Sequence, residues 1–128
     1  MKKRRFSRIR VDEQCLLEYG GRSFTGRLLD ISLHGALIEF RDDVRFHKGG
    51  RWSLALSLGN PDFVMRFGAE VVHESAGKVG VRFFEADLNT LFYLRNLLEK
   101  RIGDHRMLGR ELDRLLGDGL LRPFSPSV

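Results

Sequence analysis

Hydrophobic and polar residues alternate over much of the chain before Asp87, and this pattern predicts β-strands. From Trp52 to Leu58 every second residue is apolar, and the same pattern continues from Phe63 to Val71. Successive side chains of a strand point to opposite faces, so the alternation indicates strands with one buried face. Reading the chain in this way gives six strands, over residues 15–19, 22–29, 35–40, 52–58, 63–71 and 79–83.

The connections between these strands are mostly short and contain turn-forming residues. Gly20-Gly21 predicts a two-residue hairpin turn, whereas the longer polar stretch from Arg41 to Gly50 predicts a loop. An open sheet of six strands exposes two edges, and closure of the sheet removes both. We therefore expect a closed or nearly closed antiparallel barrel, with a small open sandwich as the competing architecture.

The hydrophobic period changes from two to three or four residues at Asp87, which indicates a helix. Asp87 is suited to cap its N-terminus and Gly103 to end it. A second helix is predicted from Asp104 to Leu116, and the glycines and prolines after it indicate a frayed tail. The predicted fold is mainly β, a six-stranded antiparallel β-barrel followed by one or two C-terminal α-helices.

The net charge of +5 is distributed unevenly along the 128 residues. The first ten residues contain six basic side chains and no acidic one, which leaves 16 basic and 17 acidic residues in the remainder. A chain of this length is most simply one domain. We expect a basic flexible N-terminal arm at residues 1–10, the barrel with its first helix at residues 11–102, and a second short helix with a frayed tail at residues 103–128. An anion captured by the arm fits this charge distribution better than a long polyanion.

Several functional classes lack their sequence signatures. No apolar run approaches the roughly 20 residues that cross a bilayer, and the charged start lacks the apolar core of a signal peptide, so we expect a cytoplasmic protein without membrane insertion. The motifs of a nucleophile elbow and of a phosphate loop are absent, and the four histidines have no metal-ligand spacing. We therefore expect no enzyme, no metal and no cofactor. Cys15 lies in a hydrophobic segment, which favours a buried structural thiol.

A small basic barrel that binds nucleic acid is an alternative function for such a chain, because its aromatic residues could stack on bases. The aromatic residues of the later strands, however, stand on the apolar faces, where a core would use them: Trp52, Phe63, Phe67 and Phe83. The nearly neutral body would also make a poor groove for a nucleic-acid backbone. Nucleic-acid binding is therefore not the function we expect.

Two motifs carry the remaining chemical information. Asp30-Ile31-Ser32-Leu33-His34-Gly35 is a polar interruption between two predicted strands, and Arg4 and Arg8 are spaced four apart in the basic arm. Alone, the first motif could be an ordinary turn. Asp and Ser cap turns with their own side chains, and Gly permits backbone conformations that other residues rarely adopt. Together, Arg-x-x-x-Arg and Asp-x-Ser-x-x-Gly resemble the motifs of the PilZ domain family, receptors for the bacterial second messenger cyclic di-GMP.

The resemblance covers roughly residues 3–102, and it implies a fold and a ligand. The family's six-stranded antiparallel barrel with a C-terminal helix agrees with the strands and the change of period described above. The two terminal helices are similar to those of short stand-alone members, which have no catalytic domain and act through a separate, here unidentified, downstream protein. Some members keep the fold without binding the ligand, so a ligand-free protein interaction module is the alternative that the resemblance implies.

The resemblance also implies roles for individual residues in binding cyclic di-GMP. Arg4 and Arg8 would supply charge for phosphate, a fork for the O6/N7 edge of guanine and a planar face for stacking. Asp30 would accept hydrogen bonds from guanine N1 and N2. Ser32 would donate to phosphate or brace Asp30, and Gly35 would allow a turn or a close backbone approach.

Three further residues are expected to be auxiliary contacts: Lys3 and Arg5 in the arm, and His34 in the turn. We expect the arm to be mobile without ligand and to be drawn onto the barrel by it, which would alter a partner-binding surface.

Overall fold

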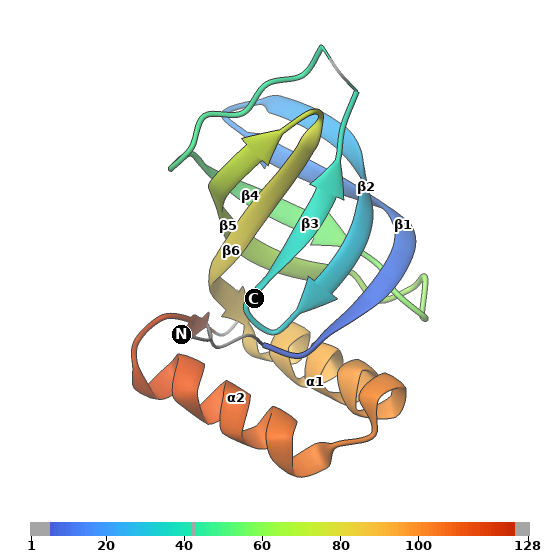
Figure 1. Ribbon diagram of the computed structural model, residues 1–128, viewed down its shortest axis with the longest axis vertical. Coiled ribbons are helices and arrows are strands. Elements are labelled where there is room, and N and C mark those ends of the chain that lie inside the picture. Colours follow the sequence, from blue (N-terminus) through green and yellow to red (C-terminus); the bar gives the residue numbers. More distant parts are fainter. Residues whose placement is uncertain (1–5, 42, 125–128) are drawn as a thin grey trace.

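The computed structural model describes residues 6–41 and 43–124, and in these ranges seven strands and two helices form one body (Figure 1). The elements follow one another as β1 (Arg8–Tyr19), β2 (Arg22–Ser32), β3 (Gly35–Glu39), β4 (Arg51–Leu56), β5 (Met65–Ser75), β6 (Lys78–Asp87), α1 (Leu88–Ile102), α2 (His105–Gly117) and β7 (Arg122–Phe124). All six predicted strands and both predicted helices are therefore present.

The first six strands close into a ring. Their order is β3-β2-β1-β4-β5-β6, every pair is antiparallel, and β6 pairs back with β3 from Gly35↔Arg82 to Glu39↔Lys78. This pairing satisfies the hydrogen-bonding groups that an open sheet would leave at its edges. The closed architecture is thus confirmed, and the competing open sandwich is excluded.

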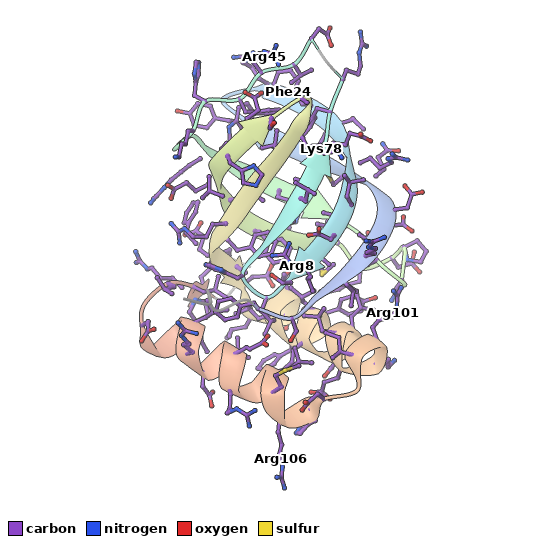
Figure 2. All side chains as sticks on the ribbon, viewed as in Figure 1. Arg8, Phe24, Arg45, Lys78, Arg101 and Arg106 are labelled. Atoms are coloured by element: carbon purple, nitrogen blue, oxygen red, sulfur yellow. The ribbon has the colours of Figure 1, made fainter. Side chains whose placement is uncertain are left out.

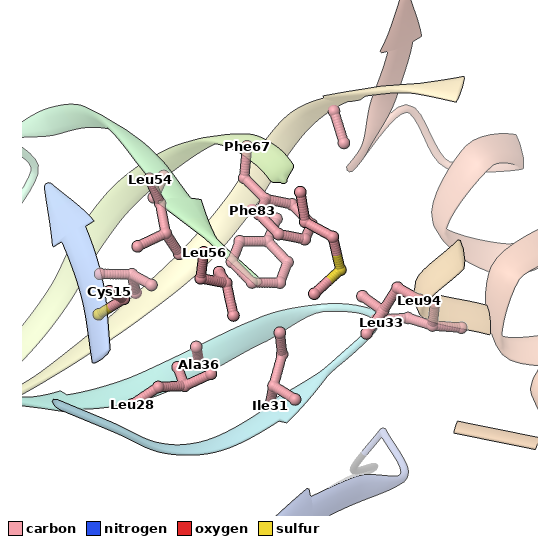
Figure 3. Packing of buried hydrophobic residues seen from close by; sticks show 14 of the residues in the cluster. Cys15, Leu28, Ile31, Leu33, Ala36, Leu54, Leu56, Phe67, Phe83 and Leu94 are labelled. Atoms are coloured by element: carbon pink, nitrogen blue, oxygen red, sulfur yellow. The ribbon is translucent and has the colours of Figure 1, made fainter. Parts of the chain in front are cut away.

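The inward faces of the strands form one hydrophobic core. Leu17, Leu28 and Leu54 are fully buried, and the rings of Phe67 and Phe83 stack at 3.9 Å between centroids. Figure 3 shows this pair between the strands. Of the four aromatic residues predicted to face inward, these two are buried and the other two pack partly buried against the core. The core therefore uses these side chains for packing, as the alternation predicted.

The thiol of Cys15 lies in this core. Burial raises its pKa to about 12, against an opposing hydrogen bond from the backbone of Gly26. A thiol held protonated in this way is a packing group, because the thiolate is the reactive form. The expectation of a structural cysteine is confirmed.

Both helices lie below one end of the ring (Figure 1). The carboxylate of Asp87 accepts a hydrogen bond from the Thr90 N–H at 2.8 Å and so caps α1, and Gly103 ends α1 in the left-handed conformation with φ 82°. The carboxylate of Asp104 caps α2 through the Met107 N–H. Leucines on one face of each helix are buried: Leu91, Leu94 and Leu98 on α1, and Leu108, Leu112 and Leu115 on α2. None of the described helices is long and apolar enough to span a membrane.

Two boundaries differ from the prediction. β1 begins at Arg8, so the last three residues of the expected arm are strand, where Ile9 points into the core between two exposed arginines. The expected frayed tail contains β7, which pairs in parallel with the end of β6 from Glu85↔Arg122 to Asp87↔Phe124. Both errors have the same physical cause, since each short segment is ordered by pairing with a distant strand and has little hydrophobic pattern of its own.

Candidate functional site

The connection between β2 and β3 is a turn organised by Ser32. Its buried hydroxyl accepts hydrogen bonds from the backbone N–H groups of His34, at 3.1 Å, and Gly35, at 3.2 Å, and it lies 3.4 Å from the carbonyl of Gly35. This is a side-chain cap of the kind that serine makes in turns. Ser32 was expected either to contact phosphate or to brace Asp30. The hydrogen bonds observed here instead stabilise the turn itself.

Gly35 stands where the ring closes. A Cβ atom at this position would lie 2.1 Å from the carbonyl oxygen of Val81 on β6, so only glycine permits this spacing of β3 and β6. The neighbouring carbonyl of His34 accepts a hydrogen bond from the Phe83 N–H at 2.8 Å. Gly35 was expected to allow either a turn or a close backbone approach. The structure shows the second role, because the backbone of β3 lies close to that of β6 at this residue.

Asp30 is turned outward by an irregularity in β2. The inward side chains before it include Leu28, and regular alternation would also turn Asp30 inward. The register shifts between Leu28 and Asp30 relative to β3, so that Ile31 becomes the inward residue. β-bulges re-aim side chains in this way. The bulge thus places the carboxylate on the outer surface.

Arg8 lies beside this carboxylate. In the β1–β2 pairing Arg8 is opposite Ser32, and its Nη1 atom is 3.5 Å from Oδ1 of Asp30. The arginine side chain is 55% exposed and that of the aspartate 18%. Such a solvated pair adds little stability, and it leaves most of the guanidinium donors available to a ligand. Arg8 and Asp30, predicted from separate motifs, are therefore neighbours in the fold.

His34 forms part of the same surface and is half-buried. Its ring packs against that of Phe6 with 4.8 Å between centroids, and its Nε2 atom has no hydrogen-bond partner within residues 6–41 and 43–124. The pKa of His34 is lowered, first by burial and then by the positive charges of Arg82, Arg114 and Arg8. The positive charges of three arginines from separate elements therefore act on this imidazole, which makes the surface attractive to anions.

Arg8, Ser32, His34 and Gly35 line a depression of about 560 Å³ on the outside of the ring, and Asp30 adjoins it through its contact with Arg8. One wall is formed by Phe6, Arg8 and the turn, and the other by residues of β5 and β6 that include His73 and Arg82. Pockets for small molecules have volumes of about 300–1,000 Å³. Figure 2 places Arg8 at the end of the ring that faces the helices.

The wall on β5 and β6 was not predicted from the sequence. Arg82 is fixed by Nη2, which donates to Glu70 at 2.7 Å, and by Nη1, 3.3 Å from the carbonyl oxygen of Leu120 after α2. The imidazole of His73 lies against Gly80, where a Cβ atom would come within 2.3 Å of its Nε2. Arg82 occupies a polar position of a predicted strand and His73 follows the end of another, but only the β3–β6 closure shows that they face the turn.

The remaining predicted contacts, Lys3, Arg4 and Arg5, lie outside the described residues. The arginine pair is therefore represented here by its second member alone. Within the described part of the chain, no group of three or more His, Cys, Asp or Glu side chains is arranged to hold a metal ion. The depression is lined by arginines and by aromatic and imidazole rings, and the carboxylate of Asp30 lies next to it beside Arg8.

Comparison with known proteins identifies both the domain and the fold. The PilZ domain family model matches residues 2–100. The structure of the Bacillus subtilis inhibitor of motility, MotI/DgrA, superimposes with a TM-score of 0.67 at 16% identity, over 79% of this chain and 52% of that one. YcgR from Escherichia coli, in complex with c-di-GMP, gives 0.66 at 18% identity, over 87% and 51%.

The isolated PilZ domain of Escherichia coli YcgR with c-di-GMP gives a TM-score of 0.63 at 17% identity, and the match covers 91% of this chain and 98% of that domain. The present chain thus spans about half the length of the full MotI/DgrA and YcgR chains. At these identities the likeness concerns the fold, and the family assignment rests on the match to residues 2–100.

Proposed function

The chain belongs to the PilZ domain family, and we propose that it is a non-catalytic receptor that binds cyclic di-GMP in the depression between the turn and strands β5 and β6. The observation that carries the proposal is that Arg8 lines a depression of about 560 Å³ and lies 3.5 Å from the carboxylate of Asp30. Structures related in fold, those of YcgR, contain c-di-GMP.

The chemistry of the depression suits this ligand. Cyclic di-GMP carries two phosphates, which Arg8 and Arg82 would bind, and two guanines, whose N1 and N2 donors match the carboxylate of Asp30. The rings of His34 and Phe6, inclined by 55° to each other, add ring faces beside these charges.

Ser32 and Gly35 support the site through the backbone in this proposal. Ser32 fixes the turn by accepting two N–H bonds, and Gly35 lets β3 approach β6, so that the two walls of the depression keep their spacing. Arg4 would close over the bound messenger together with Lys3 and Arg5. Ordering of this arm would then change the surface offered to a downstream protein.

Titration calorimetry with cyclic di-GMP tests the proposal. We expect the wild type to bind, and Arg4→Ala, Arg8→Ala and Asp30→Ala each to weaken binding roughly 10- to 100-fold, because charge-assisted hydrogen bonds are lost. Arg45→Ala is the control, since it removes the same charge from the opposite end of the ring (Figure 2).

Absence of heat from the wild type at tens of micromolar ligand would reject the receptor function and leave a ligand-free interaction module. Binding that is unchanged in all three site variants would keep the receptor function and reject the site. A loss of affinity in the Arg45 variant equal to that of Arg8→Ala would mean that only overall charge matters.

A further inference from the structure

Two sides of helix α2 make contacts with the rest of the protein. Its buried leucines pack into the core, whereas Met107, Glu111 and Arg114 form a second row along the helix. Residues spaced by four and three positions lie above one another on one side of a helix. All three side chains of this row contact the segment directly before β1. The helix therefore covers the end of the ring and also holds the start of the described chain.

The principal contact is between Glu111 and Ser7. The carboxylate accepts the Ser7 N–H at 3.1 and 3.2 Å, through its two oxygens, and the Ser7 hydroxyl at 2.7 Å. The hydroxyl also lies 3.6 Å from the sulfur of Met107. Hydrogen bonds to a part-buried carboxylate are among the stronger ones in proteins. They satisfy a backbone donor that precedes the first residue of β1.

The neighbouring contact extends from the same helix to the depression. The guanidinium carbon of Arg114 lies 5.6 Å from the centroid of the Phe6 ring, whose other neighbour is the imidazole of His34. Phe6 and Arg8, on either side of Ser7, both line the depression. Fixing Ser7 to Glu111 therefore fixes one wall of the candidate site, although Glu111 itself does not line it.

We propose that Glu111 is a positioning residue of the ligand site, which holds Phe6, Ser7 and Arg8 in their binding arrangement through its hydrogen bonds to Ser7. This inference rests on the proposed function and assigns to helix α2 a part in positioning the residues that bind the ligand. Ordering a chain segment costs conformational free energy. When the segment is already held by Glu111, the ligand does not have to supply this free energy, and its affinity rises.

The held arrangement favours binding and does not block the site. With Ser7 on Glu111, the guanidinium of Arg8 is beside Asp30 and the depression remains open on its outer side. Release of Ser7 would remove the Phe6 wall and leave the N–H of Ser7 to water. By thermodynamic linkage, ligand that binds the held segment more tightly also strengthens the contact between the segment and α2.

The test compares Glu111→Ala and Glu111→Gln with Asp113→Asn, which neutralises an exposed carboxylate on the same helix. We expect Glu111→Ala to weaken cyclic di-GMP binding roughly tenfold, as lost charge-assisted hydrogen bonds imply. Glu111→Gln keeps one acceptor oxygen and should give an intermediate loss, and Asp113→Asn should bind as the wild type does.

Two further measurements separate positioning from a general loss of structure. Amide hydrogen exchange of Ser7 should accelerate in Glu111→Ala and stay slow in Asp113→Asn, whereas the melting temperatures of the two variants should agree, because opening of a terminal segment is local. Equal affinity for wild type and Glu111→Ala, or tighter binding by the variant, would overturn the inference and leave the receptor function intact. A wild type that does not bind would reject the receptor function and the inference together.

Discussion

At the scale of single residues, His34 is the half-buried titratable group of the candidate site whose pKa is shifted. Its ring packs against Phe6, and burial, followed by the positive charges of Arg82, Arg114 and Arg8, lowers its pKa from the ordinary value of 6.5. In the unfolded chain the same imidazole binds a proton more readily. Acidification therefore lowers the free energy of unfolding by protonating His34, in the pH range between the pKa of this residue in the folded protein and its pKa in the unfolded chain.

This difference predicts a loss of stability on the acid side. The contribution of His34 is fully present above pH 6.5 and is lost as the pH falls from 6.5 through the lowered pKa of the folded protein. Urea unfolding of the wild type and of His34→Phe between pH 5 and pH 7.5 measures it. We expect the wild type to lose more stability on acidification than the variant, which keeps an aromatic ring beside Phe6. Parallel pH profiles for the two proteins would contradict this origin of the shift.

At the scale of elements, the closure between β3 and β6 brings the two walls of the candidate site together. Gly35 is the point of closest approach, and Arg82 is its partner across the strands. The bulge in β2 and the Ser32 cap then determine which side chains face outward next to this closure. The positions of the site residues are thus determined more by the register of the strands than by the conformation of any one loop.

Gly35→Ala tests the closure. The added methyl would meet the Val81 carbonyl, so β3 must move away from β6, and we expect the unfolding free energy to fall by about 1–3 kcal/mol, as for overpacked positions. Gly117→Ala is the matched control, because its Cβ would enter open space on α2 and should be neutral or stabilising by less than about 1 kcal/mol. Denaturant unfolding compares the two. An equal effect of both substitutions would show that the close approach does not limit the residue at position 35.

At the scale of the whole molecule, the candidate site lies where three parts of the chain meet: the start of β1 with the residues directly before it, the β3–β6 seam of the ring, and helix α2. Its positive charge comes from Arg8, Arg82 and Arg114, one from each part. Residues 11–128 have a nearly neutral composition. Charge is therefore concentrated locally, which favours a small anionic ligand over a long polyanion.

The fold was largely predictable because the sequence patterns that indicate its strands, turns and helix ends each span only a few residues. The strand alternation, the Gly20-Gly21 turn and the caps at Asp87 and Gly103 are each legible within a few residues of sequence. The two motifs also predicted that Arg8 and the Asp30 turn belong together. In contrast, β7 and the strand character of Arg8 depend on pairing partners that are distant in sequence.

The second wall of the site was not predictable for the same reason. His73 and Arg82 are ordinary polar residues of strands until the register of β3 against β6 is known. The contact between Glu111 and Ser7 joins residues 104 positions apart, and no pattern in either segment points to the other. Sequence reasoning therefore found the turn, but not the surfaces that enclose it.

The most direct test of the central claim is a backbone amide NMR titration of the wild type with cyclic di-GMP. We predict that the largest shift changes fall on residues 6–8, 30–35 and 80–82, while residues 22–25 and 44–48, at the opposite end of the ring, stay unchanged. Changes confined to that opposite end, or no changes at saturating ligand, would contradict the account.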